Sequence, residues 1–318
     1  MGKHNLNTND YGLHNLKNIK KKLIIDSIKK KYVTNDTYCK QLELKIKRQT
    51  NSKYCVVCNS GTSALFISLL ALKNKTNIIA IIPNINFVSV ANIVYLLKGK
   101  VVLCDIDKNS GMVSLDEFKN IIKKCGQLGI KPNVFIPIHY AGATPDLSAI
   151  SKICEKKKIK IIEDACHSFG STYDNGEKVG SSKHSSITTF SFHPLKNITT
   201  IEGGAITTNN QRLYKKILEL RSFSLKRTSI VDPYKMNHPS LNFRMGEINA
   251  AIGLDQINKV NQFRAKRQKL VKHYLKKLKN YEKHFSILNI NNKKIFWHLF
   301  VIFLKNKTLN YKKKIYEL

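Results

Sequence analysis

Residues 159–170 read IKIIEDACHSFG, a short apolar segment followed at once by two acids and a histidine. The preceding residues, DLSAISKICEKKK at 146–158, have the apolar spacing of an amphipathic helix. A helix that leads into a buried strand with polar side chains at its end is typical of a parallel sheet, where ligands bind beyond the carboxyl ends of the strands. This stretch therefore predicts an α/β fold and indicates which edge of the sheet carries a site.

The same alternation of helix and strand continues on both sides of this stretch. Strands are predicted at 53–58, 77–83, 100–107, 133–140 and 159–165, and helices at 14–32, 60–73, 87–99, 115–125 and 146–158. Because the strands are apolar throughout, helices should cover both faces of the sheet. Strand and turn at 186–208 and a helix at 211–221 follow.

The chain is predicted to have two domains. A large domain spans 1–245, and its polar first residues, 1–10, are expected to be disordered. One long helix at 246–280 leads into a small α+β domain at 246–318, with a buried strand at 295–304 and a helix at about 310. So few elements indicate that this small domain is incomplete.

The charge of the chain is strongly positive, with 55 Lys and Arg against 21 Asp and Glu and a formal net charge of +34. Nucleic acid is the first partner that such a charge suggests. The lysines are nevertheless scattered along the whole sequence, and no nucleic-acid motif accompanies them. We therefore expect no nucleic-acid partner, and anionic small substrates fit the charge equally well. A basic nucleic-acid-binding protein remains an alternative.

Seven cysteines, an odd number without a secretion signal, predict reduced thiols in the cytoplasm. Cys55 and Cys58 form a CVVC pair that lacks the two further ligands of a zinc site, so we expect a buried strand and no metal. The longest apolar run, at 295–304, is too short to span a bilayer. The sequence therefore predicts no membrane segment.

The segment NSGTSAL at 59–65 can bind an anion. Gly61 lets the backbone approach a ligand closely, and Thr62 and Ser63 supply hydroxyl groups. The helix that starts here directs its unpaired N–H groups to the same place, which suits a phosphate. The same residues can equally be an ordinary helix N-cap.

Two side chains after the strand at 159–165 could hold a heterocycle. Asp164 is costly to bury unless a positive group meets it, and a protonated ring nitrogen is such a group. His167 lies three residues further and could donate to a ring oxygen, although an ordinary buried histidine explains it as well.

A lysine in FSFHPLKNITTIEGG, residues 190–204, completes the set. Lys196 lies between Pro194 and a glycine pair, which is a poor place for an ordinary surface lysine. A lysine that binds a carbonyl covalently needs an unprotonated amine. With a hydroxyl from Ser191, these residues are together the parts that pyridoxal 5′-phosphate (PLP) requires.

The order of these motifs resembles one family. SGTSAL, NFVSVAN, CDID, HYAG, EDACHSFGS, FSFHPLKNITTIEGGAITTN, NFRMGEINAAIGLDQI and WHLFVI follow one another as in the DegT/DnrJ/EryC1/StrS aminotransferases. The resemblance runs from about Tyr11 to the last residue. It implies the aspartate aminotransferase fold (fold type I), with a large, mostly parallel seven-stranded sheet and a small domain. It also implies PLP and the amination of nucleotide-linked keto-sugars.

FHPLKNITT with EGG resembles most closely the branch that makes UDP-4-amino-4,6-dideoxy-N-acetyl-β-L-altrosamine, a precursor of pseudaminic acid. That resemblance implies transfer of an amino group from L-glutamate to C4 of a UDP-linked 4-keto-6-deoxy sugar. It also assigns roles to single residues. By position, Lys196 matches the lysine that binds PLP, Asp164 the acid on the ring nitrogen and His167 the residue at the ring hydroxyl. The family's phosphate ligands match Thr62, Ser63 and Ser191. Phe87 matches the aromatic residue that stacks on the ring, and Asn242 matches an asparagine that reaches the cofactor of a partner subunit.

The role of Asn242 implies a homodimer with shared active sites. A PLP-dependent sugar dehydratase is a rival within the same family, but such enzymes have a histidine at the position of Lys196. Two departures from the family remain. Ile201 stands where the family has glycine before EGG, so the turn there is expected to differ, because a β-branched residue disfavours a positive φ. The chain also ends before the family does, so a truncated member that binds PLP or a partner without turnover is the alternative.

Overall fold

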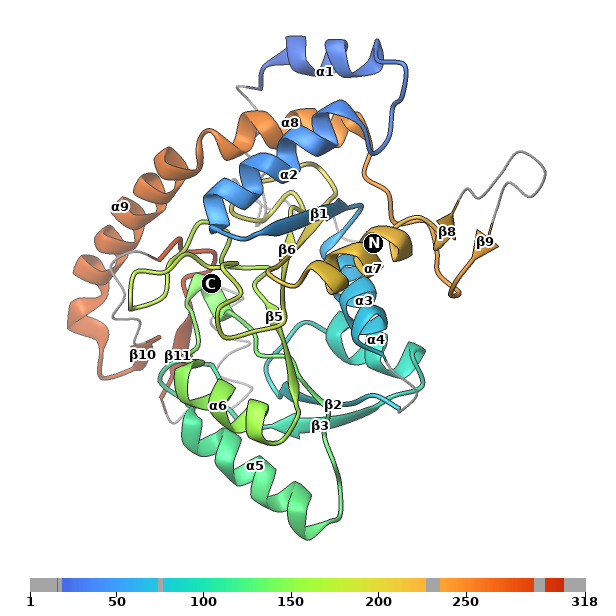
Figure 1. Ribbon diagram of the computed structural model, residues 1–318. Coiled ribbons are helices and arrows are strands. Elements are labelled where there is room, and N and C mark those ends of the chain that lie inside the picture. The colour runs from blue at the N-terminus through green and yellow to red at the C-terminus, as the bar shows by residue number, and fades with distance from the viewer. Residues whose placement is uncertain (1–15, 17–18, 74–76, 227–234, 289–294, 306–318) are drawn as a thin grey trace, which may run out of the picture.

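The computed structural model describes residues 16, 19–73, 77–226, 235–288 and 295–305. In this described part, seven strands form one sheet in the order β1-β7-β6-β5-β4-β2-β3 (Figure 1). Their bounds are β1 (Tyr54–Cys58), β2 (Ile79–Pro83), β3 (Lys100–Cys104), β4 (Val134–Phe135), β5 (Lys160–Asp164), β6 (Ile187–Ser191) and β7 (Gly204–Thr208). Only β7 runs antiparallel to its neighbours β1 and β6. The predicted mostly parallel, seven-stranded sheet is confirmed.

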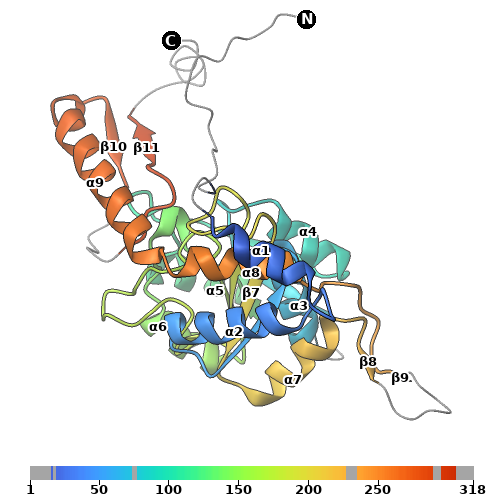
Figure 2. The ribbon, with the colours of Figure 1, turned by 90° about the horizontal axis from the view of Figure 1, so that it is seen from above.

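Helices cover both faces of this sheet (Figures 1 and 2). Their bounds are α1 (Lys21–Ile28), α2 (Thr37–Thr50), α3 (Gly61–Leu72), α4 (Ser89–Leu96), α5 (Leu115–Gln127), α6 (Ser148–Lys156), α7 (Gln211–Leu220), α8 (Glu247–Ile257) and α9 (Val260–Leu278), with short 3-10 turns η1 (Tyr140–Gly142) and η2 (Lys279–Tyr281). In β1, Val56 and Cys58 pack in a cluster with α3, whereas Cys55 and Val57 pack with α2 and α8. The strand is therefore buried on both sides, as its apolar sequence predicts.

The cysteines behave as small apolar side chains. All seven are unpaired, and all but Cys166 are buried. The strand predicted for KYCVVC is confirmed. Within the described residues, no group of three or more metal-ligating side chains could hold an ion, and no helix there is long and apolar enough to cross a membrane.

Helix α2 was not predicted, although its sequence carries a signal. Tyr38, Leu42 and Ile46 recur every four residues and are buried. This spacing places them on one face of a helix, and α2 uses that face to pack against β1 and α8. Lysines are abundant between these residues, so the composition of the segment does not show the four-residue spacing of its apolar side chains.

The single helix predicted at 246–280 is wrong. The chain forms α8 and α9, separated at Asn258 and Lys259, where Lys259 leaves helical geometry with ψ near 1°. Helix α8 lies buried against α2, while α9 extends away from the sheet (Figure 2). A straight helix could not both stay in the core and reach outward.

The strand predicted at 295–304 is also mostly wrong. Only Ile302–Leu304 (β11) is strand, and it pairs with Phe285–Ile287 (β10) outside the main sheet. The backbone of residues 295–298 instead bonds to side chains and to the Ala141 carbonyl. The helix predicted near 310 and the disorder predicted for 1–10 lie outside the described residues. The division at 245/246 into two domains stays a prediction.

Pro137 explains why the strand predicted at 133–140 shortens to β4. A proline has no N–H to donate to the ladder, so regular pairing ends before it. A second small hairpin, β8 (Leu225–Lys226) with β9 (Lys235–Met236), stands away from the body (Figures 1 and 2).

Candidate active site

Gly61 allows the start of α3 to approach the end of β6. A Cβ on Gly61 would lie 2.6 Å from the Cβ of Ser191, a distance that side chains do not tolerate. Ser60 caps the helix, because its hydroxyl accepts from the Ser63 N–H at 3.0 Å. Thr62 is exposed in the same first turn. The structure therefore brings the predicted phosphate-binding residues of α3 together with Ser191, and the N-cap interpretation also holds, through Ser60.

Asp164 is the last residue of β5 and is 3% exposed. Its backbone N–H donates to the Pro137 carbonyl at 2.9 Å, and its Oδ1 accepts from the Cys166 N–H at 3.1 Å. Burial and the nearby Asp164 carboxylate raise the pKa of the Cys166 thiol well above its usual range, so this thiol stays protonated. A buried carboxylate at the end of a strand is ready to pair with a cation.

Lys196 lies in the turn after β6 and is half-buried. Its N–H donates to the His193 carbonyl at 2.9 Å. The next residue, Asn197, ties this turn to the loop after β5, because its Nδ2 lies 3.1 Å from the His167 carbonyl and 3.3 Å from that of Phe169. The lysine turn and the loop that carries His167 are therefore held side by side.

His167 is an uncharged imidazole in this position. Burial, and after it the positive charge of Lys196, lower the pKa of His167 to about 3. Its Nδ1 is buried and has no hydrogen-bond partner within the described chain. A buried ring nitrogen without a protein partner fits a ligand oxygen at this point.

The other two predicted residues lie at the surface. The Phe87 side chain is 66% exposed and follows β2. Asn242 is exposed, and its Oδ1 accepts from the Arg244 N–H at 3.2 Å. The carbonyl of the next residue, Phe243, accepts from the Asn59 N–H, beside the start of α3. Neither side chain is brought to the lysine by any contact within the described chain.

Ile201 overturns the expectation that a β-branched residue avoids a positive φ. Its φ is +68°, in the left-handed region. The backbone on either side is held, because Ile201 N–H donates to Thr199 Oγ1 at 2.9 Å and Asn249 Nδ2 donates to the Thr200 carbonyl at 2.7 Å. Surrounding bonds of this kind are what keep a strained residue in place.

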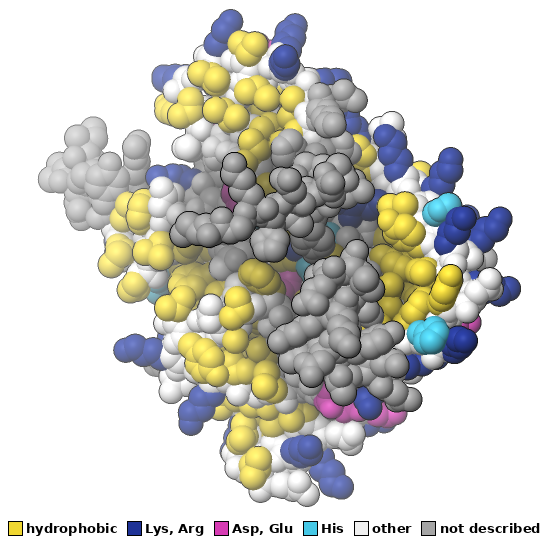
Figure 3. Space-filling view, turned by 180° about the vertical axis from the view of Figure 1, so that it is seen from behind, with side chains coloured by type: hydrophobic (Ala, Val, Ile, Leu, Met, Phe, Trp, Pro, Cys, Tyr) yellow, Lys and Arg dark blue, Asp and Glu magenta, His cyan; other side chains and the backbone are white. Residues whose placement is uncertain are grey.

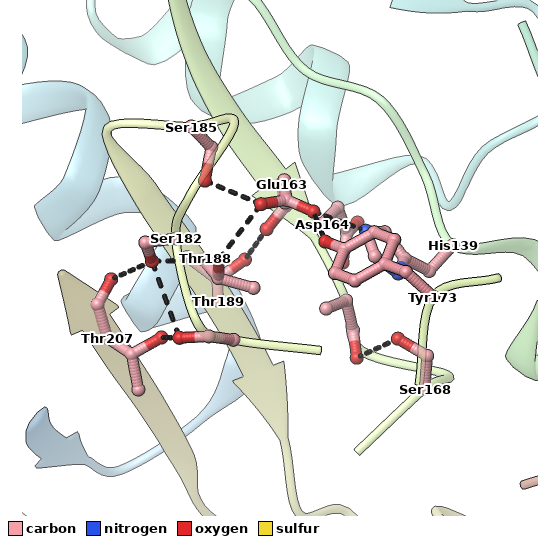
Figure 4. Close-up of polar contacts among 12 residues, drawn as sticks. His139, Glu163, Asp164, Ser168, Tyr173, Ser182, Ser185, Thr188, Thr189 and Thr207 are labelled. Atoms are coloured by element: carbon pink, nitrogen blue, oxygen red, sulfur yellow. Dashed lines mark hydrogen bonds and ion pairs between the residues drawn. The ribbon is translucent and has the colours of Figure 1, made fainter. Parts of the chain in front are cut away.

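A buried polar network behind Asp164 was not predicted (Figure 4). Glu163 is 1% exposed and points to the other side of β5. Its carboxylate lies 2.8 Å from His139 Nε2 and accepts from Ser185 at 2.5 Å, from Thr188 at 3.2 Å and from the Tyr173 hydroxyl. Burial by itself would raise the pKa of Glu163, but these hydrogen bonds, first that of His139, lower it below the usual 4.5. The residue before Asp164 is thus a fully paired carboxylate.

We predict that Glu163→Gln lowers the free energy of unfolding by about 2–4 kcal/mol at neutral pH, because the amide group meets donors and the charge-assisted bonds are lost. The folded pKa lies below the unfolded one. The stabilisation is therefore complete above pH 4.5 and is lost as the pH falls through the folded pKa. Urea unfolding of the apoprotein from pH 7 to about pH 3 should show a constant difference above pH 4.5 and convergence of the two proteins below it.

Glu155→Gln, on the exposed face of α6, is the matched control and should change stability by less than about 0.5 kcal/mol. An equal loss for Glu163→Gln at every pH would contradict the ionised state assigned to Glu163.

His298 also lies in the site and was not predicted as a functional residue. Its ring centroid is 4.3 Å from that of His167. Burial, and after it the neighbouring His167 imidazole and the positive charge of Lys196, lower the pKa of His298 to about 2. The sequence did contain a signal, a histidine inside the apolar run WHLFVI. Because the run was interpreted as a buried strand, this histidine was not assigned a role.

Comparisons with known proteins agree with this arrangement. The model of the DegT/DnrJ/EryC1/StrS aminotransferase family matches residues 15–318. UDP-4-amino-4,6-dideoxy-N-acetyl-β-L-altrosamine transaminase of Campylobacter jejuni is 34% identical over 270 residues, which are 83% of this chain and 68% of that protein. An uncharacterized protein of Methanocaldococcus jannaschii is 31% identical over 288 residues, 88% of this chain and 72% of its own.

Two solved structures have the same fold. Helicobacter pylori PseC, an aminotransferase of pseudoaminic acid biosynthesis, superposes with a TM-score of 0.86 and 27% identity over 96% of this chain and 80% of its own. The PLP form of Spr1654 from Streptococcus pneumoniae has a TM-score of 0.85 at 22% identity, covering 96% and 81%. The predicted fold type I is confirmed.

Proposed function

Because this chain belongs to the DegT/DnrJ/EryC1/StrS aminotransferase family, we propose that it transfers an amino group from L-glutamate to C4 of a UDP-linked 4-keto-6-deoxy sugar, with PLP as cofactor. The observation that carries the proposal is that Asn197 ties the turn of Lys196 to the loop of His167, which directly follows Asp164 at the end of β5. The Gly61–Ser191 approach lies at the same edge of the sheet. The Campylobacter jejuni relative supports the UDP-sugar substrate.

The side chains of this edge fit PLP. His167 has an open, buried nitrogen, and the first turn of α3 offers hydroxyl groups next to Ser191 at a place where only glycine permits the approach. We assign the phosphate to Gly61, Thr62 and Ser63 in the first turn of α3 and to Ser191 at the end of β6. When bound, PLP supplies an electron sink for the carbanion that forms when an amino acid loses its Cα proton.

The chain's own residues supply binding and proton transfer. Asp164 keeps a proton on the ring nitrogen, and its burial strengthens that interaction. His167, uncharged, donates to the ring hydroxyl. Phe87, exposed after β2, would cover one face of the ring. Lys196 would hold the cofactor through its amine, and the same amine, when free, would carry a proton between the donor Cα and C4′ of the cofactor.

A homodimer is part of this proposal, with Asn242 reaching the site of a partner subunit. Exposed apolar side chains support a contact between protein surfaces. Figure 3 shows such side chains at the top, over α1, and on the side of the β8–β9 hairpin. They include Ile25, Ile28, Tyr32, Leu225, Met236 and Leu241. The unpaired cysteines support the cytoplasm as the place of the reaction.

The test is the absorbance spectrum of the purified chain with PLP, before and after addition of L-glutamate. We expect a band of lysine-bound PLP that bleaches with L-glutamate and persists with D-glutamate. A band that does not change with L-glutamate would indicate a protein that binds PLP but does not transfer the amino group. A spectrum equal to that of free PLP would overturn the proposed function.

A further inference from the structure

Residues 295–298 are held against the floor of the site by their backbone. The Phe296 N–H donates to Ser171 Oγ at 2.8 Å, and the His298 N–H donates to the Ala141 carbonyl at 2.8 Å. A Cβ on Gly142, whose φ is +101°, would lie 2.3 Å from the Phe296 carbonyl oxygen. The turn at HYAG is thus shaped so that this segment can lie directly on it.

Two side chains fasten the same segment from the other side. Asn197 Nδ2, next to Lys196, donates to the Phe296 carbonyl at 3.0 Å. Arg267 Nη1, on α9, lies 2.9 Å from the Trp297 carbonyl, 3.3 Å from that of His298 and 3.4 Å from Asn197 Oδ1. Its guanidinium also lies 5.7 Å from the centre of the Phe296 ring. We call Asn197 and Arg267 the clamp.

The clamp places the imidazole of His298 beside that of His167. Their centroids are 4.3 Å apart, and both rings have a buried Nδ1 without a hydrogen-bond partner within the described residues. Burial and nearby positive charges, including those of Lys196 and Arg267, lower the pKa of His298 to about 2, so the ring is neutral at physiological pH. If His167 meets the cofactor, the open nitrogen of His298 is left for the substrate.

The chemistry of a neutral imidazole indicates which substrate. One nitrogen donates and the other accepts, which suits the hydroxyl and carbonyl oxygens of a sugar. The carboxylates of L-glutamate would call for a positive group, and a ring kept uncharged by burial does not supply one. A sugar whose oxygens satisfy the buried Nδ1 would be favoured over one that leaves it unpaired.

We propose that His298 contacts the sugar ring of the substrate and that Asn197 and Arg267 are positioning residues that hold it there. This inference rests on the proposed sugar aminotransferase function. It assigns specificity for the sugar to a segment that is distant from the lysine turn in sequence and joined to it through Asn197.

The test measures binding of UDP-N-acetylglucosamine and of UDP alone by calorimetry with the PLP-loaded protein. His298→Ala should weaken binding of UDP-N-acetylglucosamine about tenfold and leave binding of UDP unchanged. His298→Asn, whose amide can replace the Nδ1 position, should recover most of the loss. Arg267→Lys should weaken binding of UDP-N-acetylglucosamine about threefold. Lys266→Ala, exposed on the same helix, should bind as the unaltered chain does.

The glutamate spectrum separates this inference from the proposed function. Bleaching by L-glutamate should be the same in His298→Ala and the unaltered chain. Equal losses for UDP and UDP-N-acetylglucosamine, unchanged binding of both, or a bleaching defect in His298→Ala would each overturn the role of His298. Absence of lysine-bound PLP in the unaltered chain would instead overturn the proposed function.

Discussion

Lys196→Ala is expected to reduce amino transfer by at least about 10⁴-fold and to remove the absorbance of covalently bound PLP. The residue would perform two tasks, since it both holds the cofactor and carries the Cα proton, and losses of this size are usual when such a residue is removed. Lys196 is half-buried in a turn that Asn197 ties to the loop of His167, so its amine is held at one place in the site.

Lys196→Arg distinguishes amine chemistry from simple charge. Arginine keeps the positive charge but cannot lose its proton in a protein. We therefore expect it to be as inactive as the alanine variant. Lys215→Ala, exposed on α7, should retain full activity. Retention of turnover in Lys196→Arg would contradict the role of Lys196 and favour a site that only binds anions.

Asp164→Asn is expected to reduce turnover on the order of 10³-fold while PLP still binds to Lys196. The amide has nearly the same size, and its oxygen can still accept from the Cys166 N–H. What is lost is the negative charge opposite the ring nitrogen, in a place that is 3% exposed, where water screens little. Single-turnover measurement of bleaching by L-glutamate gives the size of the effect.

The control for Asp164→Asn makes the same change in charge on the surface. Asp174→Asn is exposed and should leave turnover within about twofold, because surface substitutions have small effects. If Asp164→Asn bleached as fast as the unaltered chain, the assignment of Asp164 to the ring nitrogen would fail.

The sequence alone determined the order of the strands of the main sheet, most of the helices between them and several candidate site residues. Local periodicity was sufficient for the sheet, because strands buried on both faces are apolar along their whole length. Gly61, Asp164, His167 and Lys196 could be selected because each follows a predicted strand end, and those ends share one edge. The family resemblance added the donor, the sugar substrate and the dimer, which neither periodicity nor the site residues indicate.

Only the tertiary structure decided the parts that depend on distant contacts. Glu163 and Asp164 are neighbours in sequence, and because side chains alternate along a strand they lie on opposite faces of the sheet. Only the packing of Tyr173, Ser185 and Thr188 shows that Glu163 is the acid whose carboxylate is paired with several side chains. His298 was read as part of a strand because its run is apolar. The His298 backbone instead bonds to the Ala141 carbonyl and to Arg267, and that of Phe296, in the same segment, bonds to Ser171. Ile201 likewise depends on distant contacts. A β-branched residue disfavours a positive φ, but hydrogen bonds involving Thr199 and Asn249 hold the backbone around Ile201 in that conformation.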